Sequence, residues 1–362
     1  MNPGVEFNPE SYGYTPELET ARCETGIDGS QPGRVLAEHK ERYIVLTKEG
    51  ECEAEVTGNL RFGARGREDF PVVGDWVNLT VFDAGQAVIH SILPRSSFIK
   101  RKAVGSPGGI QAIAANVDRA FLVQAMDRDF NLNRLERYLS ICHSSRVDPL
   151  ILLTKKDLVD EPTCSAILEK VQRRMPGIPV LASSSLTREG IAGILDNMEA
   201  GRTYCMLGSS GVGKSTLLNL LSGHDRMKTG DISASTQKGR HVTSHRELVL
   251  LDNGSLLVDN PGMREVGTAD DADGLEHTFD LILELAQLCR YGNCSHTTEA
   301  GCAVLDALRE GTLDEDQYEN YMKLEREKAH FETSQLDRKQ KEKQFGKIMK
   351  NFKKDLRKND WM

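Results

Sequence analysis

One nine-residue segment constrains the fold of this chain more than any other. It reads Gly-Ser-Ser-Gly-Val-Gly-Lys-Ser-Thr over residues 208–216, after the apolar run Tyr204–Leu207 and before the leucine-rich run Leu217–Leu221. A strand, a glycine-rich loop and a helix in this order are the context of a phosphate-binding P-loop. Apolar strands alternate with helical segments around it, which predicts an α/β domain with a parallel sheet.

The residue types of this loop suit a nucleoside triphosphate. Glycines let backbone N–H groups surround phosphate oxygens, and the start of the next helix adds the positive end of its dipole. Lys214 is predicted to neutralise the β- and γ-phosphates as a catalytic residue, and Ser215 to bind Mg²⁺. The expected phosphate-binding residues are Gly208, Ser209, Ser210, Gly211, Val212, Gly213, Lys214, Ser215 and Thr216.

A P-loop alone does not distinguish ATP from GTP, so the base must be read elsewhere. Upstream, Thr154-Lys155-Lys156-Asp157 follows the apolar run Leu150–Leu153. A carboxylate there can accept hydrogen bonds from the N1–H and N2 amine of guanine, which adenine lacks. The alternative is an Asp that merely starts a helix. The expected guanine-binding residues are Thr154, Lys155, Asp157 and, after the next strand, Ser184 and Ser185.

Downstream of the P-loop, the strand 256–258 ends in Asp259-Asn260-Pro261-Gly262. In such a D-x-x-G segment the carboxylate reaches Mg²⁺ through water, and the glycine amide senses the γ-phosphate. We therefore expect Asp259 and Gly262 to belong to the nucleotide site.

The polar segment 229–244 is typical of a mobile switch. Thr243 is its predicted Mg²⁺ ligand, and Ser244 is the alternative. Small GTPases place a glutamine after D-x-x-G, whereas this chain has Met263, which predicts slow intrinsic hydrolysis. His241 is the candidate catalytic residue that positions the attacking water; the alternative is a surface or RNA-contacting histidine.

Three cysteines and one histidine lie within fourteen residues near the C-terminal end. Four N and S donors match a tetrahedral structural Zn²⁺ site with no open position for catalysis, and buried free cysteines are the alternative. The predicted zinc ligands are Cys289, Cys294, His296 and Cys302.

Sequence pattern divides the chain into four parts. Residues 1–33 lack apolar periodicity and are expected to form a flexible arm. Residues 34–102 contain short β segments between glycine-rich turns, which predicts an OB-like β-barrel. Residues 103–270 are the predicted nucleotide domain, and residues 271–362 a small helical metal-binding domain with a basic tail.

Charge is unevenly distributed. The net charge is −8, but residues 321–362 hold 13 Lys and Arg against 7 Asp and Glu, so this end carries +6 and the remainder −14. A basic tail with interleaved aromatics suits RNA, and a solvated helix is the alternative. Basic residues near the barrel loops suit RNA or ordinary surface charge: Arg61, Arg65, Arg67, Arg95, Lys100, Arg101 and Lys102.

No apolar run is long enough for a membrane span, and no secretory signal is visible. The scattered cysteines suit a reducing compartment. A cytoplasmic monomer without a membrane partner is therefore expected.

The order of the motifs resembles that of the RsgA (YjeQ/YloQ) family of circularly permuted GTPases that depend on the small ribosomal subunit. The base-reading and serine motifs precede the P-loop, and the switch threonine and D-x-x-G follow it. Gly239–Thr243 and Ala114–Asp118 also carry the resemblance. Val242 and Asn260 depart from the residues usual in the family.

This resemblance implies an N-terminal OB domain, a permuted GTPase domain and a C-terminal zinc domain. It implies GTP hydrolysis during late maturation of the small ribosomal subunit, with that subunit and its rRNA as partners and with Zn²⁺ and Mg²⁺ as metals. In the family, the position matching His241 has been proposed to position water.

Two other functions stay open at this stage. One is a GTP-controlled RNA-binding clamp with negligible turnover, and the other is a P-loop ATPase without purine specificity.

Overall fold

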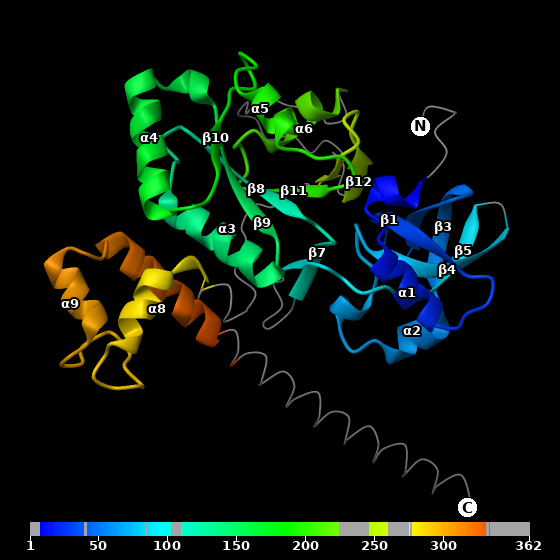
Figure 1. Cartoon of the computed structure of the whole chain (residues 1–362), viewed down its shortest axis with the longest axis horizontal. Coiled ribbons are helices and arrows are strands. Elements are labelled where there is room, and N and C mark those ends of the chain that lie inside the picture. The colour runs from blue at the N-terminus through cyan, green and yellow to red at the C-terminus, as the bar shows by residue number, and fades with distance from the viewer. Residues whose placement is uncertain are drawn as a thin grey trace, which may run out of the picture. The chain divides into compact units, whose positions relative to one another are not determined.

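The computed structural model describes residues 8–39, 42–83, 85–102, 110–223, 246–259, 275, 277–330 and 333 (Figure 1). The chain falls into two compact units: Met1–Lys100 with Ala112–Val266, and Arg101–Gln111 with Gly267–Met362. Within the described ranges, no helix is long and apolar enough to cross a membrane.

A closed five-stranded barrel forms the first part of the first unit. Its strands are β1 (Gln31–His39), β2 (Arg42–Thr47), β3 (Gly50–Val56), β4 (Trp76–Asp83) and β5 (Gln86–Ile92). They pair in the order β1-β2-β3-β5-β4, and β4 pairs back with β1 to close the barrel. Strand β3 alternates buried and exposed residues, as a strand with one face in a core does. The predicted OB-like barrel is confirmed.

Residues near the N-terminus are helical where the sequence analysis expected an arm without structure. A 3₁₀ helix η1 (Pro9–Tyr12) precedes helix α1 (Pro16–Glu24), whose N-cap is Thr15. Tyr12 is buried, and the rings of Tyr14 and Trp76 lie 4.7 Å apart. These residues therefore belong to the packed unit, because tertiary contacts with the barrel stabilise a helix too short to persist alone.

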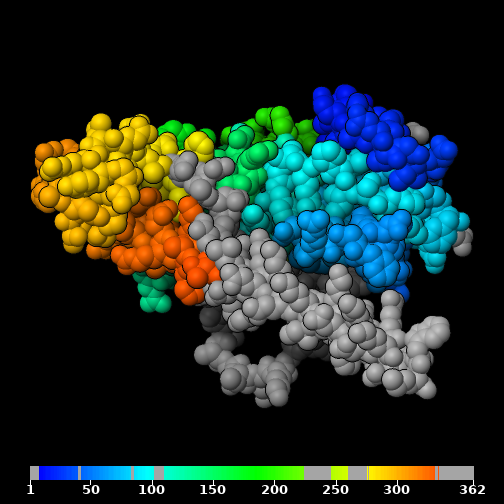
Figure 2. All heavy atoms as spheres, turned by 90° about the horizontal axis from the view of Figure 1, so that it is seen from below, coloured from blue at the N-terminus to red at the C-terminus, as the bar shows by residue number. Residues whose placement is uncertain are grey.

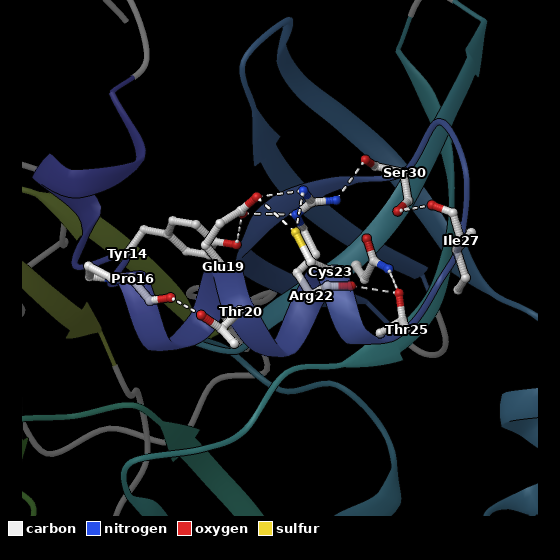
Figure 3. A network of polar contacts seen from close by, with 10 residues as sticks. Tyr14, Pro16, Glu19, Thr20, Arg22, Cys23, Thr25, Ile27 and Ser30 are labelled. Carbon is white, nitrogen blue, oxygen red and sulfur yellow. Dashed lines mark hydrogen bonds and ion pairs between the residues drawn. The ribbon is translucent and has the colours of Figure 1, made fainter.

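Helix α1 is tied to itself and to the segment that enters β1 (Figure 3). The guanidinium of Arg22 donates to the Glu19 carboxylate at 2.6 Å and to the Ser30 carbonyl at 3.1 Å. The Tyr14 hydroxyl also donates to Glu19, at 2.7 Å. Helix and strand thus form a continuous polar network.

A six-stranded sheet forms the nucleotide domain of the first unit. Its strands are β8 (Arg119–Ala125), β9 (Asp148–Thr154), β10 (Val180–Ala182), β11 (Thr203–Leu207), β12 (Glu247–Leu250) and β13 (Leu256–Asp259). Their order is β10-β9-β8-β11-β13-β12, and all neighbours are parallel except the antiparallel β12. The predicted parallel sheet is therefore present.

Two apolar cores cover the two faces of this sheet, which explains its nearly continuous hydrophobic strands. Leu122 of β8 packs in one core and Phe121 in the other. The first core includes residues of α3 (Leu132–Ser145) and α4 (Glu161–Arg174), and the second includes residues of α5 (Ile191–Asp196) and α6 (Lys214–Ser222).

Barrel and sheet are joined inside the first unit. Strand β12 pairs with β1 at Ala37 and Glu247. The buried guanidinium of Arg34 donates to the Thr203 hydroxyl at 3.0 Å and lies over the Trp76 ring. The connecting strands β6 (Phe98–Lys102) and β7 (Ile110–Ala115) form a separate two-stranded sheet among the described residues. Helix α2 (Gly58–Gly63) and the 3₁₀ helix η2 (Arg67–Asp69) lie between β3 and β4 of the barrel.

The C-terminal part of the second unit is helical. It contains α8 (Asp280–Gln287), α9 (Ala303–Glu310) and a helix over residues 315–330. The rings of Phe279 and Tyr321 meet edge to face in its core. Figure 2 shows the described part of the second unit from residue 277 to 330 in yellow and orange. The predicted small helical domain is confirmed; most of the predicted basic tail, residues 331–332 and 334–362, lies outside the described residues.

Candidate nucleotide and metal sites

The P-loop joins β11 to α6 as the sequence predicted. A Cβ on Gly208 would lie 2.4 Å from the Val123 carbonyl oxygen of β8, so only glycine fits there. Gly211 and Gly213 have φ angles of 82° and 96°, which glycine adopts without strain. Glycine is thus required at the positions that shape the loop around a phosphate.

The ammonium of Lys214 lies inside the P-loop. It donates to the carbonyls of Gly208 and Ser209, both at 2.6 Å. Burial lowers the pKa of Lys214 to about 8. A phosphate group beside it would favour the charged form that burial disfavours.

Thr154 and Asp157 of the predicted base-reading segment form hydrogen bonds with different parts of the chain. The Thr154 hydroxyl donates to the Val212 carbonyl of the P-loop at 2.6 Å. The Asp157 carboxylate accepts a short hydrogen bond from the Ser184 hydroxyl. The predicted base-reading residues are therefore linked both to the P-loop and to each other.

The two lysines of this segment point to separate carboxylates. Lys155 Nζ lies 3.0 Å from Asp127 Oδ2, beyond the end of β8. Lys156 Nζ lies 2.6 Å from a Glu189 oxygen and 3.4 Å from a Glu161 oxygen. Lys155 has a φ of 59°, and this left-handed residue separates the two directions.

Ser184 and Ser185, which follow β10, differ in whether the backbone N–H is already used in a hydrogen bond that the structure shows. The Ser184 N–H donates to the Glu189 carbonyl at 3.0 Å, and its side chain is fully buried. Ser185 is half-buried. Of the two, Ser185 is therefore the better placed to offer a backbone N–H to a guanine carbonyl.

Asp259 ends strand β13, where the sequence predicted a Mg²⁺-linked carboxylate. Burial, and secondarily the charge of Glu247, raises the pKa of Asp259 to about 6. Glu247 stands directly opposite Asp259 in the antiparallel pair of β12 and β13. The other predicted switch residues, His241, Thr243 and Gly262, lie outside the described residues.

These segments meet at one edge of the sheet. Thr154, Gly208 and Asp259 lie at or just beyond the carboxyl ends of the parallel strands β9, β11 and β13. Ligands of α/β proteins bind at this edge of the sheet. The structure thus brings together the described parts of the predicted nucleotide site.

Sequence reasoning missed two residues at this edge. The Tyr138 hydroxyl of α3 lies 3.4 Å from the Ser209 hydroxyl of the P-loop. Asp127 pairs with Lys155, as described above. Asp127 could have been found as an acidic residue just after an apolar strand, but nothing in the sequence around Tyr138 indicates a P-loop contact.

The four predicted metal ligands of the second unit converge. Their ligand atoms all lie within 4.8 Å of one another. Cys289 Sγ is 3.8 Å from Cys302 Sγ and 3.6 Å from His296 Nδ1. The Tyr318 hydroxyl donates to the His296 carbonyl at 2.6 Å and so ties the loop to the helix over 315–330. Three sulfurs and one nitrogen at this spacing could hold a single metal ion.

Comparison with known proteins gives the family. The model of the RsgA GTPase family matches residues 92–269. The Small ribosomal subunit biogenesis GTPase RsgA 1 of Bacteroides thetaiotaomicron is 39% identical, over 96% of this chain and 97% of that protein. The chain belongs to the RsgA family of P-loop GTPases.

Other relatives agree with this membership. The Small ribosomal subunit biogenesis GTPase RsgA of Opitutus terrae is 41% identical, over 83% of this chain and 84% of that protein. The ABC transporter family model also matches, over residues 193–360, a range that includes the P-loop. Since both classes of protein bind nucleotides through P-loops, that match is compatible with RsgA membership.

Two solved structures share the architecture of this RsgA family member. The crystal structure of YjeQ from Thermotoga maritima aligns with a TM-score of 0.60 and 25% identity, covering 82% of this chain and 97% of that one. YloQ, described as a circularly permuted GTPase, aligns at 0.58 and 26%, covering 86% and 96%. In this chain too, β9 with the predicted base-reading segment precedes P-loop strand β11, so the motif order is permuted.

Proposed function

We propose that this RsgA family member hydrolyses GTP to GDP and phosphate on the small ribosomal subunit, during late maturation of that subunit. The observation that carries the proposal is the meeting of the base-reading segment, the P-loop and Asp259 at one sheet edge. The relatives named as small ribosomal subunit biogenesis GTPases support the partner. Their names favour turnover over a GTP-controlled clamp with negligible hydrolysis.

Each group at this edge has a proposed part in GTP binding. The P-loop amides and Lys214 bind the phosphates, and Ser215 together with Asp259, through water, holds Mg²⁺. Asp157 reads guanine, and an N–H at Ser185 meets the guanine carbonyl. The hydrogen bond from the Ser184 hydroxyl to the Asp157 carboxylate supports the proposed role of Asp157, because it orients the carboxylate. Thr243 as Mg²⁺ ligand, Gly262 as γ-phosphate sensor and His241 as water-positioning residue remain predictions from sequence.

We also propose that the metal of the Cys₃His cluster is a structural zinc ion. Thiolate and imidazole donors prefer zinc to the hard cations Mg²⁺ and Ca²⁺, and four protein ligands leave no position for substrate. The barrel starts before the expected residue 34, because β1 begins at Gln31. The proposed domains are this barrel up to residue 102, the GTPase domain over 103–270 and the zinc domain with its tail over 271–362. Barrel and tail are the proposed rRNA contacts of a cytoplasmic monomer.

Steady-state GTP hydrolysis, with and without purified small ribosomal subunits, tests the proposed function. Because Met263 cannot orient water well, we expect slow hydrolysis alone and a stimulation of at least about a hundredfold by the small subunit. Large subunits serve as the control and should stimulate little. Equal, slow rates with and without small subunits would favour the clamp.

The raised pKa of Asp259 predicts that GTPase activity falls at acidic pH, so that its pH profile has an acid limb. A carboxylate with a pKa of about 6 takes up a proton as pH falls through 6 and then attracts Mg²⁺ less. We expect kcat/KM for Mg²⁺-GTP to fall about tenfold between pH 7 and pH 5.

Replacing Glu247 with glutamine should move this acid limb to lower pH. The substitution removes the negative charge that faces Asp259 from β12. This charge is the smaller of the two causes of the raised pKa, so the acid limb should move only part of the way toward the ordinary pKa of an Asp. The measurement is the pH profile of kcat/KM for the wild-type protein and for Glu247→Gln. A profile that is flat down to pH 5, or identical limbs in both proteins, would contradict the assignment to Asp259.

A further inference from the structure

Asp127 and Lys155 occupy matching positions at the nucleotide edge of the sheet. Each lies just past the end of a parallel strand, and the register pairs Ala125 of β8 with Thr154 of β9. The N–H of Met126 still donates to the Thr154 carbonyl, at 2.8 Å. The backbones that carry the two side chains are therefore held side by side up to the residue before each of them.

The Asp127 carboxylate is fixed on both of its oxygens. Oδ1 accepts from the Asp129 N–H at 3.0 Å, and Oδ2 lies 3.0 Å from Lys155 Nζ. The side chains of Asp127 and Lys155 are 22% and 34% exposed. The ammonium of Lys155 is thus held by an acceptor that is itself held by the backbone.

Lys156 cannot replace Lys155 in this arrangement. Its ammonium is drawn to Glu189 and Glu161, and its N–H donates to the Ser183 carbonyl at 3.1 Å. Of the two lysines beside the guanine-reading Asp157, only Lys155 reaches toward β8 and its neighbour, the P-loop strand β11.

We propose that Asp127 is a positioning residue for guanine binding, which acts by holding Lys155 so that its aliphatic stem covers one face of the base. This inference rests on the proposed function. A free lysine loses rotamer freedom when it packs against a ligand, and that entropy opposes binding. Asp127 fixes the side chain before the nucleotide arrives, so less entropy is lost on binding.

The test measures equilibrium binding of a fluorescent GDP analogue, without ribosomal subunits. Replacing Asp127 with asparagine keeps the shape but removes the charge, and we expect Kd to rise about threefold, the range of a partly exposed ion pair. The KM for GTP should rise by the same factor while kcat is unchanged. Glu189→Gln is the matched control, because it removes an ion pair of Lys156 and leaves that of Lys155 intact, and it should leave Kd unchanged.

A double variant separates positioning from a structural role. Lys155→Ala should weaken binding at least as much as Asp127→Asn, and Asp127→Asn should add nothing in the Lys155→Ala background. Equal weakening by Asp127→Asn in both backgrounds, or none in the wild-type background, would overturn the inference. An unchanged Kd in Lys155→Ala would also overturn the inference, whereas loss of the GTP preference of the wild-type protein would count against the proposed guanine site instead.

Discussion

Replacing Asp157 with alanine is expected to reduce the preference for GTP over ATP, measured as the ratio of kcat/KM values, by about a thousandfold. Guanine offers two donors that pair with a carboxylate, and adenine offers none at those positions. The carboxylate is already oriented by the Ser184 hydroxyl. Binding adenine would leave the Asp157 carboxylate without a donor from the base, and this penalty is what the alanine variant removes.

The matched control is Asp160→Ala, three residues further along. Asp160 caps α4 by accepting from the Thr163 N–H at 3.0 Å. Its loss should lower the stability of the protein, because α4 loses its N-cap, and leave the nucleotide preference unchanged. Hydrolysis of GTP and ATP is measured for both variants in the presence of small subunits. A wild-type protein without preference for GTP would point to the P-loop ATPase, and an Asp157→Ala variant that keeps the preference would place base reading elsewhere.

Replacing Cys302 with serine is expected to release the metal and unfold the second unit. Cys302 is 2% exposed and lies both in the metal cluster and in the core of this unit. In small zinc domains, metal binding contributes about 10–16 kcal/mol to folding. The described core of the second unit is one small cluster, which is too little to fold without the metal.

Metal content, with limited proteolysis to locate the unfolded part, measures this effect. Cys23→Ser is the control, because Cys23 lies exposed on helix α1 and should be replaceable without loss of metal. The GTP-binding unit has core clusters of its own among the described residues, so it should keep its nucleotide affinity in both variants. Full metal content in Cys302→Ser, or an intact second unit after chelation, would contradict the prediction.

The nucleotide chemistry could be predicted from sequence because it depends on local order. A loop that wraps a phosphate needs glycine where φ is positive or the backbone is crowded, and Gly208, Gly211 and Gly213 stand at those positions. The cysteines and histidine of the metal cluster are close in sequence, so their short spacing alone brings them together. Strands of the barrel and sheet followed from apolar patterning, because burial on one or both faces sets that pattern.

Other features depend on contacts between residues distant in sequence, and these only the tertiary structure decided. Helix α1 persists because its Leu18 packs against the first core, as do Tyr12 and Tyr14 just before the helix. Which lysine faces β8 depends on the left-handed backbone of Lys155 and on Asp127, 28 residues away. The Ser184 N–H donates to the Glu189 carbonyl across a turn, and the residue types of this segment do not predict that hydrogen bond. The sequence by itself determined which groups can bind GTP and a metal, whereas long-range packing determined which of them point toward one another, because that depends on strand order and register.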